Sequence, residues 1–521
     1  MTSNKPIANW TIDILLSLGV KTIICSPGSR NAPLVMAAVA REELEVITIL
    51  DERSAAFLAL GYIQEQARPV AVCCTSGSAL ANYHPSVLEA FHSRLPLIVV
   101  SADRPANRIL KGEGQTCVQP DFYTPHIGAS VHIDEQTPEE AFESVFQSLN
   151  DSIIEHFPVH INCAFQEPLY ETIARFPKRS FQAKELAPME SIPWEFLEQL
   201  LTTGGETAVL IGQLSPQQSL VLRKILSLEH WRVPVFADPT SGLLDHPMTR
   251  SMNQVLAYSP SVVLSIGGQW VNKQPKFHLR SIGVKQHIHW DPYQSWEVLD
   301  APSFLHIKAN VKEFERLVQW IQPLQPEIDK KQPLEGNLPW SDAAVAQQLF
   351  ETIHPDEVLH LGNSTAVRYF EFFPCRANVL SNRGIAGIDG SLSTAVGAAL
   401  AAPSKRHWCL IGDQSFIYDS NALNVPSLPD NLTVVVLNNG VGAIFDWLPG
   451  TQKADRRAQK VFSNPIQVNL QGIAMAFGVN YQSVSNFGAL KKSLHNASGC
   501  MIIDVDTKLA PNADVAKKLM S

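Results

Sequence analysis

Short runs of β-branched and aliphatic residues alternate with segments of helical periodicity along almost the whole chain. In the first third, three of these apolar runs are residues 22–25, 70–73 and 97–100, and a small or polar loop follows each of them. Alternation of apolar strands with amphipathic helices is typical of parallel sheets covered by helices. We therefore predict an α/β protein built from doubly wound parallel sheets.

Two polar, proline-containing stretches, residues 175–193 and 322–339, interrupt this alternation and are interpreted as linkers. They divide the 521 residues into three parts, in agreement with the usual size of domains. The predicted domains are residues 1–175, 190–322 and 340–521. Polar loops after strands are concentrated in the first and last domains, and ligands bind beyond the carboxyl ends of parallel strands.

Composition narrows the class of protein. A hydrophobic fraction of 45% and a charged fraction of 17% are those of an ordinary globular protein. A net charge of −9 without a basic run argues against nucleic acid as a partner. The eight cysteines show no CxxC pairing, which fits a reducing compartment. No apolar stretch is long enough to span a membrane and the N-terminus lacks a signal-peptide pattern, so we expect a cytoplasmic protein.

Two polar residues follow apolar runs of the last domain. Asp413 comes after residues 406–411, and Asn439 comes after residues 432–437. If both runs are parallel strands, the carboxylate and the amide lie at one edge of the sheet. Gly-Asp and Asn-Asn-Gly are also common turn sequences, and either alone would be a weak signal. Together they indicate a Mg²⁺ site that also holds a diphosphate, because Mg²⁺ prefers oxygen ligands.

This arrangement resembles the thiamine diphosphate motif, which runs from Gly-Asp-Gly to Asn-Asn. Gln414 stands where the motif has its last glycine, and the gap to the asparagines is slightly short. The resemblance implies thiamine diphosphate as the cofactor. It also implies that Asp413, Asn439 and the main-chain carbonyl of Val441 hold Mg²⁺, or Mn²⁺ in its place.

Glu52 lies where an apolar run gives way to an alanine-rich segment. An acid in the first turn of a helix is also common for a structural reason, since it complements the helix dipole. In thiamine diphosphate enzymes, a carboxylic acid bonds to the aminopyrimidine ring and promotes the tautomer that activates the cofactor. The resemblance assigns this role to Glu52. In that superfamily the acid and the diphosphate site come from different subunits, which implies a homodimer, alone or paired into a homotetramer.

Cationic side chains are concentrated in the loops that follow predicted strands. A lone surface arginine is usually a solvated charge, so none of them is decisive by itself. Several together indicate carboxylate recognition, because a guanidinium group binds a carboxylate through two hydrogen bonds. The candidates are Arg30, Arg104, Lys273, Arg368 and Arg383.

Five motifs at these positions carry a more specific resemblance. They are Ser-Pro-Gly-Ser-Arg at 26–30, Ala-Asp-Arg-Pro at 102–105, Gly-Gln-Thr at 114–116, Gly-Asn-Ser at 362–364 and Ser-Asn-Arg-Gly at 381–384. In this combination, from near residue 12 to residue 505, the chain resembles the 2-succinyl-5-enolpyruvyl-6-hydroxy-3-cyclohexene-1-carboxylate (SEPHCHC) synthase family of menaquinone biosynthesis. The middle third and the part after residue 447 match more loosely, and residues 462–465 depart from the family pattern.

The family resemblance implies a carboligase. Such an enzyme decarboxylates 2-oxoglutarate on thiamine diphosphate and adds the succinyl carbanion to isochorismate in a Stetter-type 1,4-addition. Its three domains are of the thiamine diphosphate-dependent decarboxylase type: a pyrimidine-binding domain, a central domain and a diphosphate-binding domain. Both substrates are dicarboxylates, which accounts for the cationic loops.

The resemblance also assigns residues to roles by motif position. Catalytic groups would be Glu52, Arg368 and Arg383. Cofactor contacts would come from Glu52, Ser78, Asn82, Arg383, Ile388, Asp413, Ser415, Asn439, Ile444 and Phe445. Isochorismate contacts would come from Ser29, Arg30, Arg104, Gln115 and Lys273. Substrate contacts of the last domain would come from Asn363, Ser364, Arg368 and Arg383, with the two arginines on the oxoglutarate-derived part.

Three other functions fit the sequence less well. An enzyme of the acetolactate synthase type would use pyruvate, but a monocarboxylate gives no reason for so many cations. A non-catalytic paralogue would be expected to lose the glutamate or a metal ligand, and Glu52, Asp413 and Asn439 are all present. A flavin or nicotinamide dehydrogenase is disfavoured because no GxGxxG follows the first predicted strand.

Overall fold

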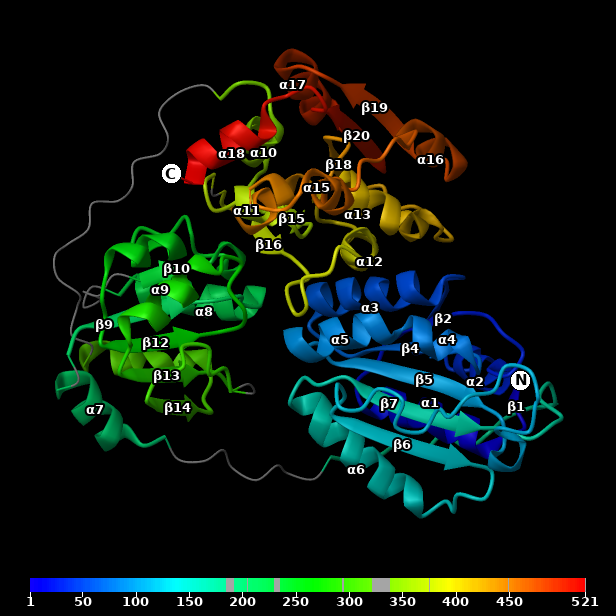
Figure 1. Ribbon diagram of the computed structural model, residues 1–521. Coiled ribbons are helices and arrows are strands. Elements are labelled where there is room, and N and C mark those ends of the chain that lie inside the picture. The colour runs from blue at the N-terminus through cyan, green and yellow to red at the C-terminus, as the bar shows by residue number, and fades with distance from the viewer. Residues whose placement is uncertain are drawn as a thin grey trace.

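The structure is a computed structural model that describes residues 1–183, 192–203, 205–228, 235–292, 295–320, 338–373, 375–447 and 449–520. It contains three sheets of six parallel strands each, with helices packed against them (Figure 1). This arrangement confirms the predicted fold class of three doubly wound α/β domains. A short antiparallel pair, β1 (Thr2–Ser3) with β8 (Thr172–Ile173), joins the two ends of the first domain.

In the first domain the strand order is β3-β2-β4-β5-β7-β6. The strands are β2 (Thr22–Cys25), β3 (Glu45–Thr48), β4 (Val70–Cys74), β5 (Leu97–Asp103), β6 (Ala129–Asp134) and β7 (Val159–Ala164). Successive side chains of a strand point to opposite faces, so Ile23 packs against one layer of helices and Ile24 against the other. The first layer is α1 (Pro6–Ser17), α2 (Ala32–Val39) and α6 (Ala141–Ile154); the second includes α3 (Glu52–Gln66), α4 (Ser78–Asn82) and α5 (His84–Ser93).

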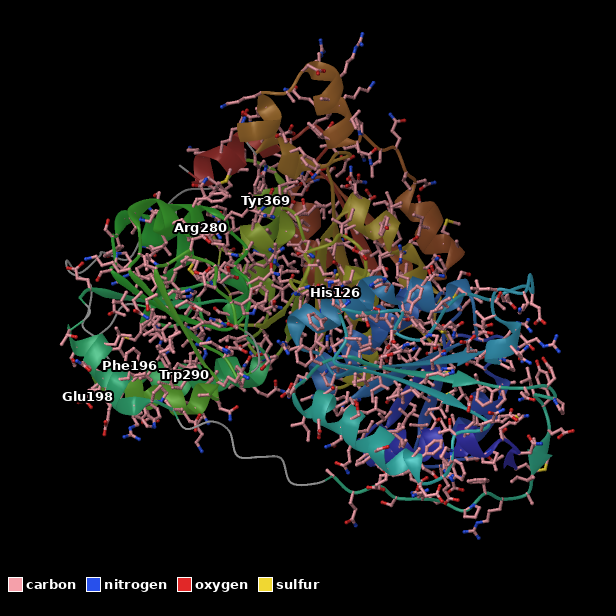
Figure 2. All side chains as sticks on the ribbon, turned by 60° about the horizontal axis from the view of Figure 1, so that its bottom comes forward. His126, Phe196, Glu198, Arg280, Trp290 and Tyr369 are labelled. Carbon is pink, nitrogen blue, oxygen red and sulfur yellow. The ribbon has the colours of Figure 1, made fainter. Side chains whose placement is uncertain are left out.

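In the middle domain the strand order is β11-β10-β9-β12-β13-β14. The strands are β9 (Thr207–Ile211), β10 (Val235–Ala237), β11 (Thr249–Ser251), β12 (Val262–Ile266), β13 (Gln286–Trp290) and β14 (Ser303–Ile307). The helices are α7 (Trp194–Thr203), α8 (Pro216–Leu226) and α9 (Gln274–Ile282), with 3-10 turns η2 (Pro239–Ser241), η3 (Met252–Ala257) and η4 (Val311–Trp320). Trp290 lies inside this domain (Figure 2), where its fully buried ring contacts that of Phe314 and anchors the core.

In the last domain the strand order is β16-β15-β17-β18-β20-β19. The strands are β15 (Val358–Leu361), β16 (Asn378–Leu380), β17 (His407–Gly412), β18 (Leu432–Asn438), β19 (Asn480–Val484) and β20 (Met501–Asp506). Its helices begin with α10 (Asp342–Thr352), α11 (Ala366–Tyr369), α12 (Ser391–Ala401), α13 (Asp413–Tyr418) and the turn η5 (Ser420–Leu423). They continue with the turn η6 (Ala443–Asp446), α14 (Pro449–Gln452), α15 (Arg456–Ser463), α16 (Leu470–Ala476), α17 (Phe487–Asn496) and α18 (Asn512–Met520). The strands β17 and β18 are the two apolar runs that were predicted to carry Asp413 and Asn439.

The described residues omit 184–191 of the first predicted linker and nearly all of the second, 322–337. Residues 175–183 of the first linker form neither helix nor strand. The predicted domain boundaries therefore stay predictions. None of the helices in the described part of the chain has the length and apolar character needed to cross a membrane.

The first and last domains meet where α3 crosses α12 (Figure 1). Two glycines lie at the crossing. A Cβ on Gly397 would stand 2.1 Å from the carbonyl oxygen of Leu58, and one on Gly61 would stand 2.1 Å from that of Thr394. Both contacts are with backbone atoms, which cannot rotate away, so the close approach requires glycine on each helix.

We expect Gly397→Ala to push α12 away from α3 and to lower stability by roughly 1–3 kcal/mol, the usual cost of an overpacked contact. The melting temperature should fall by several degrees. Gly488→Ala is the control, because a Cβ there meets only a side-chain oxygen of Asn486 at 3.5 Å. A Gly397→Ala protein that melts with the wild type would show that the two helices are not tightly held.

Candidate active site

Asp413 and Asn439 lie at neighbouring strand ends, as their positions in the sequence predict. The strands β17 and β18 pair in parallel, with Gly412 opposite Leu437. The Asp413 carboxylate accepts hydrogen bonds from the backbone N–H of Gln414 at 2.7 Å and of Gly440 at 2.6 Å. The second bond attaches the loop after β18 directly to Asp413.

Negative charge accumulates around this loop. Asn439 donates through its Nδ2 to the buried carboxylate of Asp342 at 2.7 Å, and its Oδ1 accepts from the N–H of Val441 at 3.0 Å. Burial raises the pKa of Asp413 to about 6, with the Asp342 carboxylate as a further cause, and burial likewise raises the pKa of Asp342 to about 6. A divalent cation would favour the ionised forms of both acids, so the group of donors fits a hard metal ion.

The Val441 carbonyl accepts from the N–H of Ala443 at 2.9 Å. A carbonyl oxygen has two lone pairs, so one remains for a metal. Ser415, two residues beyond Asp413, donates its hydroxyl to the carbonyl of Ile388 at 2.6 Å. This bond joins the start of α13 to the loop that carries the partly exposed Ile388 side chain.

Glu52 is the first residue of α3, and the N-cap Asp51 accepts from the N–H of Arg53 and Ser54. The half-buried Glu52 carboxylate accepts a hydrogen bond from Asn82 at 3.2 Å. Asn82 ends the short helix α4, and Ser78 begins it. Three predicted cofactor contacts therefore lie on adjoining helix ends.

The start of α3 also contacts the last domain. Arg53 donates to the carbonyl of Tyr418 at 2.7 Å, and its guanidinium lies over the Tyr418 ring. Asp51 accepts from Asn421 at 2.8 Å. Tyr418 ends the helix that Asp413 begins, so the turn that carries Glu52 is fixed to the far end of α13.

Arg383 is buried and Arg368 is half-buried, and the residues that hold them, Asn363 and Ser364, are neighbours in the sequence. Arg383 donates to the Oδ1 of Asn363 at 2.6 Å, and Arg368 donates to the carbonyl of Ser364. Asn363 in turn donates to the carbonyls of Asn382 and Gly387. Burial, and then repulsion from Arg383, lowers the pKa of Arg368 to about 10, and burial lowers the pKa of Arg383. Two guanidinium groups held together in this way form a strong anion-binding site.

Carboxylates from all three domains surround these arginines, and the sequence had not singled them out. Glu89 of α5 accepts from the N–H of Gly384 at 2.8 Å and of Ile385 at 3.0 Å. Asp238 of the middle domain accepts from the N–H of Val271 at 2.7 Å. Burial raises the pKa of Glu371, in the last domain, to about 7. In the sequence, each of these acids is a single charge in a helix or loop, which is only a weak indication of a functional site.

The middle domain contributes a lysine that differs from the predicted one. Lys273 is exposed at the N-cap of α9, and its substrate contact stays a prediction. Lys276, one turn further on, is half-buried over the ring of Trp270. Burial lowers its pKa, although Asp238 opposes this shift. Helical spacing puts both lysines on one face of α9.

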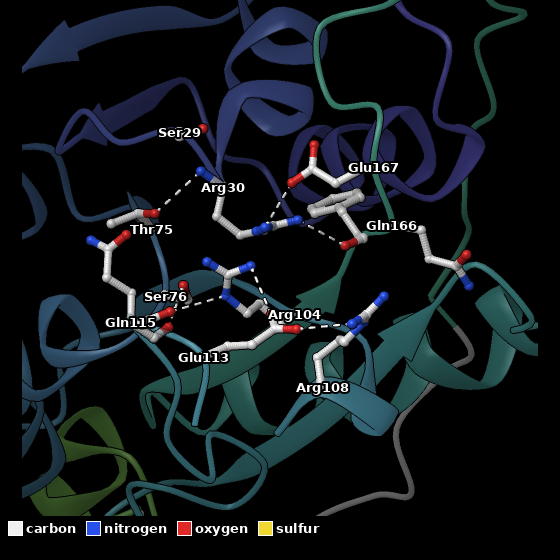
Figure 3. Close-up of polar contacts among 12 residues, drawn as sticks. Ser29, Arg30, Thr75, Ser76, Arg104, Arg108, Glu113, Gln115, Gln166 and Glu167 are labelled. Atoms are coloured by element: carbon white, nitrogen blue, oxygen red, sulfur yellow. Dashed lines mark hydrogen bonds and ion pairs between the residues drawn. The ribbon is translucent and has the colours of Figure 1, made fainter. Parts of the chain in front are cut away.

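A second group of cations lies at the carboxyl ends of β2, β4 and β5 (Figure 3). Arg30 donates to the carbonyl of Phe165 at 3.2 Å and pairs with Glu167 at 2.9 Å. Arg104 donates to the carbonyl of Gly114 at 3.2 Å. The predicted neighbours are also held there: Ser29 bonds to Tyr170, and the carbonyl of Gln115 accepts from Ser76.

Glu113 bridges two arginines of this second group. Its carboxylate pairs with Arg104 at 3.3 Å and with Arg108 at 3.1 Å (Figure 3). Neither Glu113 nor Arg108 was predicted. One cationic group, with Arg30, Arg104 and Arg108, thus belongs to the first domain, and the other, with Arg368 and Arg383, belongs to the last domain.

The last predicted contacts lie beyond the loop after β18, residues 439–442, which we call the metal loop because it carries Asn439 and Val441. Ile444 and Phe445 are half-buried in η6, and the Phe445 ring stacks on that of Phe462. Gln414, the departure from the cofactor motif, donates to the carbonyls of Ser463 at 3.2 Å and Asn464 at 2.9 Å. Both of these carbonyls belong to residues 462–465, which also depart from the family pattern.

Comparison with known proteins agrees with this geometry. Residues 6–122 match the family described as thiamine pyrophosphate enzyme, N-terminal TPP binding domain, and residues 361–505 match the corresponding C-terminal TPP binding domain. The fold is similar to that of benzoylformate decarboxylase from Polynucleobacter necessarius, with a TM-score of 0.75 and 16% identity over 97% of this chain and 98% of that one.

Two relatives in sequence are SEPHCHC synthases. That of Flavobacterium psychrophilum is 31% identical over 97% of each chain. That of Desulfotalea psychrophila is 34% identical over 89% of this chain and 90% of its own. The similarity spans all three domains, and both halves of the cofactor site are included in it. The chain therefore belongs to the 2-succinyl-5-enolpyruvyl-6-hydroxy-3-cyclohexene-1-carboxylate synthase family of thiamine diphosphate enzymes.

Proposed function

We propose that the chain catalyses the reaction of its family: decarboxylation of 2-oxoglutarate and transfer of the remaining four-carbon unit to isochorismate. The observation that carries the proposal is a pair of arginines, the buried Arg383 and the half-buried Arg368, in the last domain of a thiamine diphosphate fold. The carboxylates of Glu89, Asp238 and Glu371 already lie around this pair, and guanidinium groups still bind a substrate carboxylate through paired hydrogen bonds. A dicarboxylate such as 2-oxoglutarate offers one carboxylate to each arginine, whereas pyruvate offers only one.

We assign the metal to Asp413, Asn439 and the carbonyl of Val441, with Mg²⁺ as the ion and Mn²⁺ as its substitute. Thiamine diphosphate, when bound, supplies a carbon nucleophile and an electron sink. Ile388, Ile444 and Phe445 present apolar surface to it, and the hydroxyl of Ser415 supports the Ile388 loop.

Glu52 is assigned to the aminopyrimidine ring, with Ser78 and Asn82 at the same edge. Asn82 already bonds to the Glu52 carboxylate and orients it. A carboxylic acid at this position would hold a proton at the ring nitrogen, which is the acid–base role that activation of the cofactor requires. Arg383, in the loop after β16, supplies the remaining cofactor contact.

The two cationic groups divide the substrates between them. Arg368 and Arg383, with Asn363 and Ser364, would hold the oxoglutarate-derived part. Isochorismate, the second dicarboxylate, would contact the other group, which consists of Ser29, Arg30, Arg104, Gln115 and Lys273.

We propose a homodimer in which Glu52 of one subunit faces the metal loop of the other, with a tetramer of two such dimers as the larger form. The partly exposed Glu52 supports this assembly. We place the enzyme in the cytoplasm, in keeping with its free cysteines among the described residues.

The direct test follows isochorismate by its ultraviolet absorbance with 2-oxoglutarate, Mg²⁺ and thiamine diphosphate supplied together or omitted one at a time. We expect absorbance to fall only in the complete mixture, and chelation of the metal to stop the reaction. Carbon dioxide release from pyruvate with no loss of isochorismate would overturn the substrate assignment and leave the cofactor assignment standing.

Glu52→Gln should reduce kcat by about 10²–10⁴-fold, the usual contribution of a positioned acid or base. Binding of thiamine diphosphate should persist, because the amide keeps the shape of the side chain. Glu42→Gln, an exposed change in the same domain, is the control. Turnover at the wild-type rate would remove Glu52 as the activating acid.

Glu113→Gln should lower the KM for isochorismate about fivefold, because Glu113 competes with the substrate for Arg104 and a surface ion pair is worth up to about 1 kcal/mol. The kcat should stay unchanged, since Glu113 does not contact the cofactor residues. Glu155→Gln, exposed at the end of α6, serves as the charge-matched control. A higher KM would mean that Glu113 positions Arg104 for the substrate instead of occupying it.

A further inference from the structure

Gln414 links two departures from the family pattern that lie far apart in the sequence. One is its own position, and the other is residues 462–465. Its backbone N–H donates to the carboxylate of Asp413 at 2.7 Å. Its side-chain amide donates to the carbonyls of Ser463 at 3.2 Å and Asn464 at 2.9 Å. One residue therefore contacts both the proposed metal ligand and the end of α15. The glycine of the cofactor motif has no side chain for the second contact.

The segment 456–466, which we call the cover segment, has little other attachment. No side chain of α15 is buried, and Val461 is 75% exposed. A helix without a buried apolar face gains little from tertiary packing, so its position depends on its hydrogen bonds. Figure 1 shows α15 beside α13, the helix to which Gln414 belongs.

The Gln459 side chain also donates to the carbonyls of Gln452 at 3.0 Å and Ala454 at 2.9 Å, outside the segment. Two backbone bonds then join the segment to the metal loop. The N–H of Gly442 donates to the carbonyl of Ser463 at 2.6 Å, and the N–H of Ile466 donates to the carbonyl of Gly440 at 3.0 Å. Asn464 has a φ of +40°, a left-handed turn that ends α15. This turn lets the consecutive carbonyls of residues 463 and 464 both face the Gln414 amide.

We propose that Gln414 is a positioning residue that fixes the cover segment on the metal loop before the cofactor binds. It acts through the carbonyls of Ser463 and Asn464, and so holds Gly442 and the stacked rings of Phe445 and Phe462 in place. The role of these rings at the cofactor rests on the proposed function. The attachment itself does not.

The test is amide hydrogen exchange of the cofactor-free protein, read by mass spectrometry on peptides that cover residues 456–466. Gln414→Glu keeps the shape of the side chain and removes its N–H donors. Loss of two hydrogen bonds of about 1 kcal/mol or less each should speed exchange of the cover segment about 5- to 30-fold. Residues 501–506 of β20 should exchange as in the wild type. Gln414→Lys restores a donor of similar reach and should recover most of the protection.

Gln471→Glu, the same change at an exposed position of α16, should leave the cover segment as it is in the wild type. Unchanged exchange of the cover segment in Gln414→Glu would overturn the proposal. Faster exchange spread evenly over the domain would overturn it too, since Gln414 would then support the core. If Gln414→Glu does not fold, Gln414→Gly removes the same donors without a charge. Because no substrate or cofactor is present, failure of the proposed activity leaves this result readable.

Discussion

The buried carboxylate of Asp413 is the point on which the arrangement of the site depends. Its hydrogen bonds to Gln414 and Gly440 hold the ends of β17 and β18 together, and Asn439 extends the same loop to Asp342. Two buried carboxylates that lie close together repel each other and lose their hydration. Both effects disfavour the ionised forms unless a cation binds nearby. Hydrogen bonds thus fix the shape of the loop, and a bound metal ion would balance the charge of the two carboxylates.

Buried charges are also balanced around Arg368 and Arg383, and there the balancing groups come from all three domains. Arg383 lies beside Asn363 of its own domain, while the loop that follows it is held by Glu89 of the first domain. Gln269 of the middle domain donates to the carbonyl of Gly384 in that same loop at 2.6 Å. The close crossing of α3 and α12 keeps the first and last domains at the separation that these bonds require. A change in domain packing would therefore alter substrate affinity, although the packing contacts lie away from the substrate.

Much of this was predictable because parallel sheets place polar loops at a common edge. The apolar runs before Asp413 and Asn439 sufficed to place these two residues together. Asp342 could not be found this way, because it follows a linker and looks like any first-turn acid of a helix. Its role comes from a contact with Asn439, far away in the sequence. The roles of Glu89 and Asp238 arise from domain packing, which no local pattern encodes.

Gly61 and Gly397 illustrate the same limit, since each lies inside an ordinary helical pattern and only the crossing explains it. The predicted domain boundaries and the roles of the site residues stay predictions. What local pattern does encode is the direction of the strands and the chemistry at their ends. That is enough to place the site, and the packing of the domains then supplies the charges that tune it.

The central claim is that Asp413 and its loop form a metal-dependent diphosphate site, and calorimetric titration of thiamine diphosphate into metal-free protein tests it most directly. We expect binding to need Mg²⁺ and to weaken at least about 10-fold in Asp413→Asn, while the exposed control Asp430→Asn binds like the wild type. Equal affinity with and without Mg²⁺, or wild-type affinity in Asp413→Asn, would contradict the account.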